Sequence, residues 1–566
     1  MNASDAIQSL NSHQPTQRRA ADEIVDLLSR SGVRTIFGLP GAAISPIYDS
    51  LLDHPEIRVV NCKQETMAVF AAAAHARATD SVAVVLVTSG PGVTNAITGL
   101  ASANCDGIPL LLLGGEVLTS QYGRGALQEG GPEALDLRAM LERVTKASFR
   151  LSRAQSATAV MRKALATARS GRRGSVFVSL PFDLLSAEIV PTRLETSVAS
   201  HFEVDGRDLD EAAALLAAAE RPLIIAGSGA RWGRGPKELL GLAERGKIPV
   251  ITSPKAKGVF PESHPLALGI FGFGGHPSAQ RYLEAGVDVL LAVGAGFGEV
   301  ATNAWDPTIR ASRSFVQIDV DASQIGKNYR ADLGLLGPAE VLLRELRERL
   351  PKRRQPWKVQ GLERHEIEPR DPREPGMAAP EAIVALQRAL PSDTVFCGDV
   401  GDHLLFALHY LTIDRPDAFY FAGGLGSMGS GLGAAIGLKL AMPDRPVCCI
   451  CGDGTLSMFG TELLTVAEEK LDIVFAVLND GGYGMGVRFC DRVFGRSAEF
   501  RIPGLDVPAL ARSLGLAGRR IERPAEIAEL GAIAGPTVLD LALTRAAAVP
   551  LQARFNRVAE AMSEAA

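Results

Sequence analysis

Apolar runs of strand length alternate with amphipathic stretches along most of this chain. Runs such as VAVVLV at 82–87 and PLLLL at 109–113 are about a third as long as a membrane span, so they indicate buried strands. Other stretches place apolar residues three and four positions apart, as on one face of a helix. Strands that alternate with helices are typical of α/β layers. The pattern therefore predicts an α/β fold with doubly wound parallel sheets.

The 566-residue chain is too long for one core, and its length alone predicts about three to four domains. Repeated strand-and-turn patterns place a first domain at 15–187, a central domain at 205–347 and a third domain at 378–550. Residues 348–377 are charged, rich in proline and poor in apolar side chains, which indicates a linker. Residues 551–566 form a tail with a helical pattern.

Composition narrows the class of protein without identifying a function. With 46% hydrophobic and 22% charged residues, the chain has the make-up of an ordinary soluble globular protein. A net charge of −5 gives no basis for nucleic-acid binding. The N-terminus has no apolar run and thus no secretory signal, so we expect a cytoplasmic protein without a membrane partner. The seven cysteines lie largely in strand-like runs, as small buried side chains do.

The segment from Gly452 to Met485 carries the strongest chemical pattern. It reads Gly-Asp-Gly, then a 24-residue spacer at 455–478, then NDGGYGM. The spacer begins as an amphipathic helix and ends as an apolar strand, so Asp453 and Asn479 both lie at strand ends, where open parallel sheets bind ligands. A carboxylate, an amide and a backbone carbonyl suit Mg²⁺, and the glycines admit phosphate. A lone Gly-Asp-Gly is more often a tight turn, but the spacing favours a site.

This spacing resembles the signature of thiamine diphosphate-dependent enzymes, in which a second asparagine usually stands at the position of Asp480. The resemblance implies Mg²⁺ held by Asp453, Asn479 and the backbone carbonyl of Gly481. It also implies a pyrimidine-binding domain, a central domain and a diphosphate-binding domain, in chain order. The cofactor contacts that it implies in this segment are Gly452, Asp453, Gly454, Thr455, Asn479, Gly481, Tyr483, Gly484 and Met485.

In the first domain, residues 88–92, Asn95 and Asp106 with Pro109 match the pyrimidine-binding domain of that family, and Glu65 falls on the position of its activating glutamate. By itself, Glu65 would be an acid that favours the first turn of a helix. The resemblance instead implies that it protonates the aminopyrimidine ring, which then generates a thiazolium carbanion. It further implies that Glu65 acts on cofactor bound by the other subunit, so a homodimer or homotetramer is expected.

Two segments of the third domain match further cofactor contacts of the family, and their residues are Gly401, Asp402, His403, Gly426, Ser427 and Met428. The resemblance implies that Met428 wedges the cofactor into a bent shape while the Gly426 carbonyl accepts a hydrogen bond from the aminopyrimidine. His403 falls in the segment that contacts the diphosphate, and Asp402 stands where glutamine is common. A flexible loop before a helix and a structural histidine are the alternatives.

The resemblance covers nearly the whole chain and is closest to the acetohydroxyacid (acetolactate) synthases. FGLPGAAISPIYDSL at 37–51 and GRGALQEGG at 123–131 are similar to the corresponding synthase segments. The Leu-Gln pair at 127–128 is also similar to benzaldehyde lyase. Phenylalanine is usual at the position of Leu127, and tryptophan is usual at that of Phe489.

The central domain departs further from the synthases. Where they carry a run with two arginines, this chain has AGFGEV at 295–300. One of those arginines usually binds the acceptor carboxylate and the run helps to seat FAD, so FAD is open but not favoured. Arg488, Arg492 and Arg496 would share one helical face and could bind an anion instead, although a solvated face is the simpler interpretation.

The resemblance implies Mg²⁺-dependent decarboxylation of a 2-oxo acid, pyruvate above all, and transfer of the acyl-anion equivalent to a second carbonyl compound. The residues expected to face the substrate are Gly41, Ala42, Leu127, Gln128, Met485 and Phe489. Among them, Gln128 would hydrogen-bond the reacting oxygens, and Gly41 with Ala42 would line the reacting carbonyl. The alternatives are a benzaldehyde lyase-like carboligase or lyase acting on 2-hydroxy ketones, and an inactive regulatory homologue.

Overall fold

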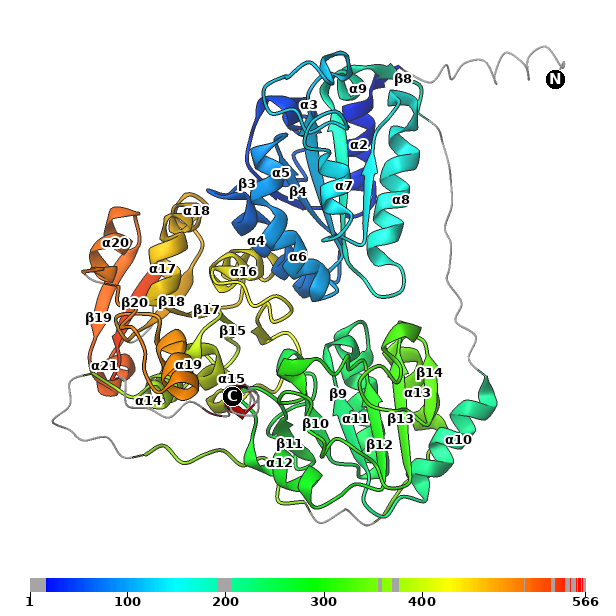
Figure 1. Cartoon of the computed structure of the whole chain (residues 1–566), viewed down its shortest axis with the longest axis vertical. Helices are drawn as coiled ribbons and strands as arrows, with labels where there is room; N and C mark the ends of the chain where they lie inside the picture. The colour runs from blue at the N-terminus through cyan, green and yellow to red at the C-terminus, as the bar shows by residue number, and fades with distance from the viewer. Residues whose placement is uncertain are drawn as a thin grey trace. The chain divides into compact units, whose positions relative to one another are not determined.

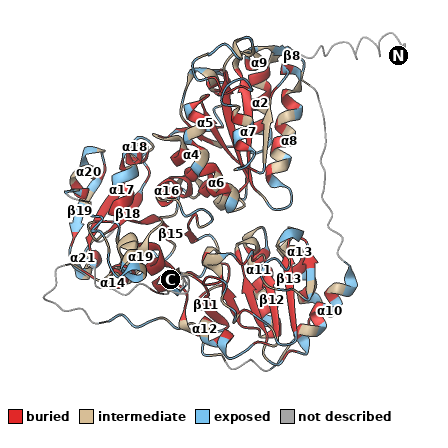
Figure 2. Ribbon diagram, in the orientation of Figure 1, coloured by how far each residue is buried: buried red, intermediate tan, exposed pale blue. Residues whose placement is uncertain are grey.

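A computed structural model describes residues 17–191, 205–354, 359–368, 376–502, 504–530, 535–544, 550, 556, 558–560 and 562. The chain divides into two compact units, Met1–Arg77 with Ser81–Ser200 and Ala78–Asp80 with His201–Ala566. In the described residues, the first unit holds one six-stranded sheet and the second unit holds two (Figure 1). Figure 2 shows that the buried positions concentrate on the central strands of these sheets.

The sheet of the first unit is parallel throughout, in the order β3-β2-β4-β5-β7-β6. Its central strands are rich in buried Val and Leu, as strands covered by helices on both faces require. The strands are β2 (Thr35–Gly38), β3 (Arg58–Asn61), β4 (Ala83–Val87), β5 (Leu110–Glu116), β6 (Ala147–Arg150) and β7 (Ser175–Pro181). The helices are α2 (Ala20–Arg30), α3 (Ser45–Leu51), α4 (Glu65–Thr79), α5 (Pro91–Asn95), α6 (Ile97–Cys105), α7 (Leu137–Leu141), α8 (Ala157–Arg169) and α9 (Phe182–Ser186). A two-stranded antiparallel ribbon joins β1 (Arg18–Arg19) to β8 (Glu188–Ile189).

The second sheet, which forms the central domain, is also parallel, in the order β11-β10-β9-β12-β13-β14. Its strands are β9 (Leu223–Ala226), β10 (Val250–Thr252), β11 (Ala267–Ile270), β12 (Val289–Val293), β13 (Ser314–Asp319) and β14 (Leu333–Leu336). Its helices are α10 (Gly206–Ala217), α11 (Gly235–Gly246), α12 (Pro277–Glu284) and α13 (Ala339–Arg349).

The third sheet has the order β16-β15-β17-β18-β20-β19 and is likewise parallel. Its strands are β15 (Val395–Gly398), β16 (Phe419–Tyr420), β17 (Val447–Gly452), β18 (Ile473–Asn479), β19 (Ala517–Ile521) and β20 (Thr537–Ala542). Its helices are α14 (Ala379–Ala389), α15 (Asp402–Tyr410), α16 (Ser430–Ala441), α17 (Asp453–Phe459), α18 (Leu463–Glu468), α19 (Gly484–Phe494), α20 (Val507–Ser513) and α21 (Pro524–Ala528). Strand order reverses between β15 and β17, which places a ligand crevice at their carboxyl ends.

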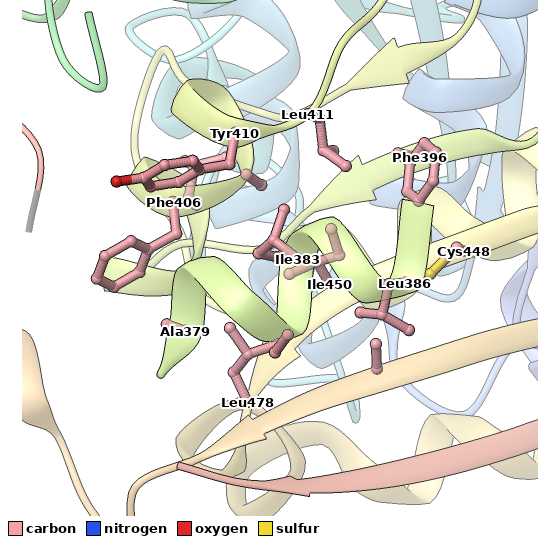
Figure 3. Close-up of a cluster of buried hydrophobic side chains, with 14 of the residues drawn as sticks. Ala379, Ile383, Leu386, Phe396, Phe406, Tyr410, Leu411, Cys448, Ile450 and Leu478 are labelled. Atoms are coloured by element: carbon pink, nitrogen blue, oxygen red, sulfur yellow. The ribbon is translucent and has the colours of Figure 1, made fainter. Parts of the chain in front are cut away.

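A buried apolar cluster holds α14 and α15 against the third sheet. Figure 3 shows Ile383 and Leu386 of α14 gathered with Ile450 of β17 and Leu478 of β18, and all four side chains are buried. Leu404 of α15 belongs to the same cluster. Close packing of this kind fixes the position of α15, whose first turn carries predicted cofactor contacts.

The predicted fold class, three parallel α/β sheets, is confirmed. Residues 355–358 and 369–375 of the predicted linker, and most of the tail at 551–566, lie outside the described residues. No helix in the described part of the chain has the length and apolar character needed to cross a membrane. Burial raises the pKa of the Cys397 and Cys448 thiols, as expected for small buried side chains.

Candidate functional site

The residues predicted to hold a metal lie at two neighbouring strand ends of the third sheet. β17 ends at Gly452 and α17 begins at Asp453, while Asn479 is the last residue of β18. These strands pair in parallel with Gly452 opposite Leu478, so Asp453 and Asn479 lie at the same sheet edge. Their predicted places in the sheet are confirmed, and their role stays a prediction.

The spacer between them differs from the single helix that its pattern predicts. α17 ends at Phe459, a short 3-10 segment covers Gly460–Glu462, and α18 follows. Phe459 leaves helical geometry, with φ −130° and ψ 13°, and its ring packs against Gly429, where an added Cβ would lie 2.5 Å from it. The interruption therefore coincides with a contact to a distant loop, which the local apolar pattern does not report.

A cavity of about 500 Å³ opens at this sheet edge. The predicted residues that line it are Gly401, Asp402, His403, Gly426, Met428, Gly452, Asp453, Gly454, Thr455, Tyr483, Gly484, Met485 and Phe489. Ser427, Asn479 and Gly481 belong to the same turns but are not among its lining residues. The cavity therefore gathers the start of α15, the turn before α16, the junction of β17 with α17 and the start of α19.

Asp453 is a buried acid among other acids. Burial raises the pKa of its carboxyl to about 7, and the nearby carboxylates of Asp480 and Asp540 act in the same direction. Two hydrogen bonds orient the Asn479 side chain. Its amide nitrogen donates to Asp540 at 2.8 Å, and its amide oxygen accepts from the Gly481 N–H at 3.1 Å. A divalent cation would favour the ionised form of Asp453, so the donor set fits a metal.

The raised pKa of Asp453 predicts a pH dependence of stability in the metal-free chain. Its ordinary pKa is 3.8 and its folded value is about 7, so the folded chain binds this proton more tightly than the unfolded chain. The stabilising contribution is complete below the ordinary value and is lost as pH rises through about 7. We expect the midpoint of thermal unfolding of the wild type, relative to Asp453→Asn, to fall between pH 5 and pH 8. If the unfolding midpoints of the wild type and of Asp453→Asn instead change in parallel across that range, the raised pKa of Asp453 is contradicted.

His403 lies in the segment that is predicted to contact the diphosphate of the cofactor, and it lines the cavity. Its Nε2 atom is buried and has no hydrogen-bond partner among the residues that the structure describes. Burial lowers the pKa of His403, and the neighbouring Asp399 opposes that shift. The backbone comes close to this ring, since a Cβ on Gly452 would lie 3.2 Å from His403 Nδ1. A ligand with anionic oxygens in the cavity would therefore meet an available ring nitrogen.

Asp402 would repel such an anion, but it forms an ion pair with Arg488 of α19, which also lines the cavity. The expected row of three arginines on one helical face is wrong. α19 ends at Phe494 and Gly495 adopts φ +68°, which places Arg496 beyond the helix. Arg488 is thus the member of that set that lines the cavity.

Asp399 begins the segment that matches the diphosphate contacts of the family, but the motif assigned it no role of its own. Its carboxylate is fully buried after β15 and accepts hydrogen bonds from the backbone N–H groups of Gly429 at 3.1 Å and Gly431 at 2.8 Å. The Thr455 hydroxyl also donates to it. One carboxylate therefore holds the turn that carries Met428 next to the start of α17. The feature of the sequence that could have identified Asp399 is its position directly after a buried strand.

The predicted residues of the first unit gather at the ends of its own strands. Glu65 is the first residue of α4 and is half-buried, and its Oε2 atom accepts a hydrogen bond from the Asn95 amide at 3.1 Å. Gly41 approaches Thr88 so closely that an added Cβ would lie 2.4 Å from the Thr88 Cβ. Ala42 begins the short 3-10 segment that follows β2. The sequence motifs therefore meet in space within this unit.

Leu127 and Gln128 occupy a loop of the first unit. The Leu127 side chain is 89% exposed, Gln128 is exposed as well, and the backbone of Gln128 adopts φ +63°. These residues are available to a partner or substrate. The expectation that Leu127 and Gln128 face the substrate stays a prediction.

Comparisons with known proteins find a matching family domain in each of the three parts of the chain that carry a sheet. The N-terminal thiamine pyrophosphate binding domain matches residues 18–136, the central domain of thiamine pyrophosphate enzymes matches 209–346, and the C-terminal binding domain matches 399–541. The acetolactate synthase isozyme 3 large subunit of Escherichia coli is 34% identical over 531 residues, covering 90% of each chain.

Two further comparisons agree. An acetolactate synthase of Mycobacterium bovis is 32% identical over 537 residues, covering 91% of this chain and 85% of that protein. A solved structure from Mycobacterium smegmatis, provisionally assigned as a thiamin diphosphate-dependent enzyme, superposes with a TM-score of 0.80 at 25% identity, covering 93% of this chain and 99% of that one. Since each of the three sheets contains strands matched by a family domain and the relatives match nearly the whole length, this chain belongs to the thiamine pyrophosphate enzyme family and is similar to the acetolactate synthase large subunits.

Proposed function

We propose that this protein is a thiamine diphosphate- and Mg²⁺-dependent carboligase. It decarboxylates a 2-oxo acid, with pyruvate as the first candidate, and transfers the acyl-anion equivalent to a second carbonyl compound. The observation that carries this proposal is the placement of Asp453 and Asn479 at adjacent strand ends beside the cavity. A relative named acetolactate synthase, matched over 90% of its length, favours this reaction over the benzaldehyde lyase-like alternative.

Asp453, Asn479 and the Gly481 carbonyl would hold the Mg²⁺ ion, which takes oxygen ligands and keeps phosphate oxygens in its coordination shell. Gly481 has a positive φ of +73°, and its carbonyl accepts a hydrogen bond from the Ile502 N–H at 3.1 Å, so a metal would use the second lone pair of that oxygen. Around the cofactor tail, Arg488 offsets the charge of Asp402, and His403 offers its ring nitrogen. When bound, the coenzyme supplies a thiazolium ring that accepts the electrons released as CO₂ leaves.

Glu65 would hold and return a proton at its Oε1 atom, because Oε2 is occupied by the Asn95 amide. That hydrogen bond orients the carboxyl group, as general acid–base catalysis requires. The family resemblance assigns Glu65 to cofactor bound by the other subunit, so a homodimer or homotetramer is part of the proposal.

The substrate end of the cavity would be apolar on one side. Met485 and Phe489 lie one turn apart on α19, and both line the cavity. Together they suit the methyl group of a small 2-oxo acid. Gln128, Gly41 and Ala42 would complete the reacting carbonyl's surroundings.

FAD is not included in the proposal. Phe297 lies in the segment where the synthases carry the run that helps to seat FAD. Its ring is 4% exposed and packs edge-on against Phe315 at 5.8 Å and Tyr329 at 5.3 Å between ring centroids. An aromatic ring buried in the domain core supports a structural role for this segment.

The test is the product spectrum from pyruvate with thiamine diphosphate and Mg²⁺, with and without added FAD. We expect CO₂ together with an acetolactate- or acetoin-type product, and no requirement for FAD. Benzoin is offered in a parallel assay, and its cleavage without turnover of pyruvate would favour the lyase alternative. Absence of CO₂ and of any carboligation product from either substrate would contradict an active carboligase.

A further inference from the structure

Glu116 is a buried carboxylate that is not among the site residues considered above. It is the last residue of β5 and its side chain is fully buried. Its Oε1 atom accepts hydrogen bonds from the Ser89 hydroxyl at 2.9 Å, the Val117 N–H at 2.8 Å and the Gly130 N–H at 3.0 Å. A buried acid needs such donors, since an uncompensated charge away from water is costly.

Those donors come from the two segments that flank Gln128. The single Ser89 hydroxyl proton lies between two acceptors, because the backbone carbonyl of Gln128 is 2.7 Å from Ser89 Oγ, so a shared hydrogen bond links the carboxylate to that residue. Gly90 has φ +58°, and a Cβ on it would lie 3.1 Å from the Cα of Gln128. The motif after β4 and the Gln128 backbone are therefore in direct contact, with Glu116 beneath both.

The loop itself is held by a second buried acid. Glu129, with 6% of its side chain exposed, accepts from the Gly123 N–H at 2.6 Å and the Ala126 N–H at 3.2 Å. Gln128 adopts φ +63°, a conformation that non-glycine residues enter only when their surroundings impose it. Hydrogen bonds to two carboxylates supply that constraint, and they leave the side chain of Gln128 facing outward.

We propose that Glu116 is a positioning residue that fixes the backbone at Gln128 through Ser89 and Gly130, so that the Gln128 side chain is presented to the reacting oxygens of the substrate. That Gln128 faces the reacting oxygens of the substrate rests on the proposed function. That Glu116 fixes the backbone at Gln128 does not, because it is a property of the loop.

The test compares the holoenzyme with the variants Glu116→Ala, Glu116→Gln, Ser89→Ala and Gln128→Ala. We expect Glu116→Ala to lower kcat from pyruvate by about 10- to 100-fold, with the calorimetric Kd for thiamine diphosphate in Mg²⁺ unchanged, because Glu116 is neither a predicted cofactor contact nor a residue that lines the cavity. Glu116→Gln keeps an acceptor oxygen and is expected to recover most of the loss. Glu133→Gln, an exposed acid of the same loop, is the matched control.

Coupling distinguishes positioning from general destabilisation. The combination of Glu116→Ala with Gln128→Ala is expected to be no slower than Gln128→Ala alone, because one side chain acts through the other. The proposal would be overturned if the double variant lost kcat by the product of the two single losses. It would also be overturned by an unchanged kcat in Glu116→Ala, or by equal losses of kcat in Glu116→Ala and Glu116→Gln. If Glu116→Ala fails to fold, Ser89→Ala gives the same comparison, since it removes only the link between Glu116 and Gln128.

A readout independent of turnover separates this inference from the proposed function. If the wild type forms no product, amide hydrogen exchange across residues 121–131 is compared instead. Faster exchange in Glu116→Ala than in Glu116→Gln and Glu133→Gln would support the positioning role, and equal exchange in all of them would overturn it.

Discussion

Replacing Glu65 with glutamine is expected to lower kcat by about 10²- to 10⁴-fold, the range over which one general acid–base group acts. Glutamine keeps the shape of the side chain, and its amide oxygen can still accept the hydrogen bond from Asn95. It cannot take up and return a proton. The loss should therefore appear in kcat and leave the Mg²⁺-dependent Kd for thiamine diphosphate unchanged, as measured by calorimetry.

Glu188→Gln is the control, because Glu188 is an exposed acid of the same unit. It should retain wild-type turnover. A Glu65→Gln variant that turns over pyruvate at the wild-type rate would remove Glu65 from the mechanism. If cofactor binding were lost together with kcat, Glu65 would instead have a role in binding.

Replacing Asp453 with asparagine is expected to abolish useful cofactor binding. Loss of a residue that only supports a metal ligand costs about 10- to 100-fold in affinity, so loss of the charged ligand itself should raise the Kd for thiamine diphosphate in Mg²⁺ by more than about 100-fold. The same change should stabilise the metal-free chain at pH 8. The ionised carboxylate of Asp453 is disfavoured there by burial and by Asp480, and asparagine carries no charge.

Asp453→Asn is expected to weaken cofactor binding but to raise the stability of the metal-free chain, and these opposite effects make the prediction specific. Asp472→Asn, which neutralises an exposed acid just before β18, should change neither quantity. A variant at Asp453 that binds the coenzyme normally would exclude this carboxylate as a metal ligand. A variant that loses both affinity and metal-free stability would point to a role in folding instead.

The parts of the site that could be predicted from the sequence rest on local patterns. Asp453 and Asn479 each follow an apolar run, and parallel strands end at one edge, so hydrophobic periodicity was enough to bring them together. Glu65 lies at a junction between a strand and an alanine-rich helix, but its role was assigned through the family resemblance and not through periodicity. The positions of these residues needed no knowledge of distant contacts.

The predictions that failed involve features that local patterns do not report. Spacing by four placed Arg496 on a helix, but that helix ends at Phe494 and is followed by the left-handed Gly495, so Arg496 lies beyond it. Asp399 and Glu116 were assigned no role of their own, because their backbone donors at Gly130, Gly429 and Gly431 lie 14 or more residues away along the chain. A single acid after a strand carries no sign of which backbone will fold onto it.

The sequence by itself determined the three parallel α/β sheets, their order along the chain and the strand ends that carry the predicted oxygen ligands, because side-chain periodicity and chain connectivity are properties of neighbouring residues. Only the tertiary structure decided the electrostatics of the site. The pKa of Asp453, the pairing of Asp402 with Arg488 and the burial of Glu116 depend on which distant groups exclude water from each carboxylate. Desolvation and Coulomb interaction act through space, so folding had to bring those groups together first.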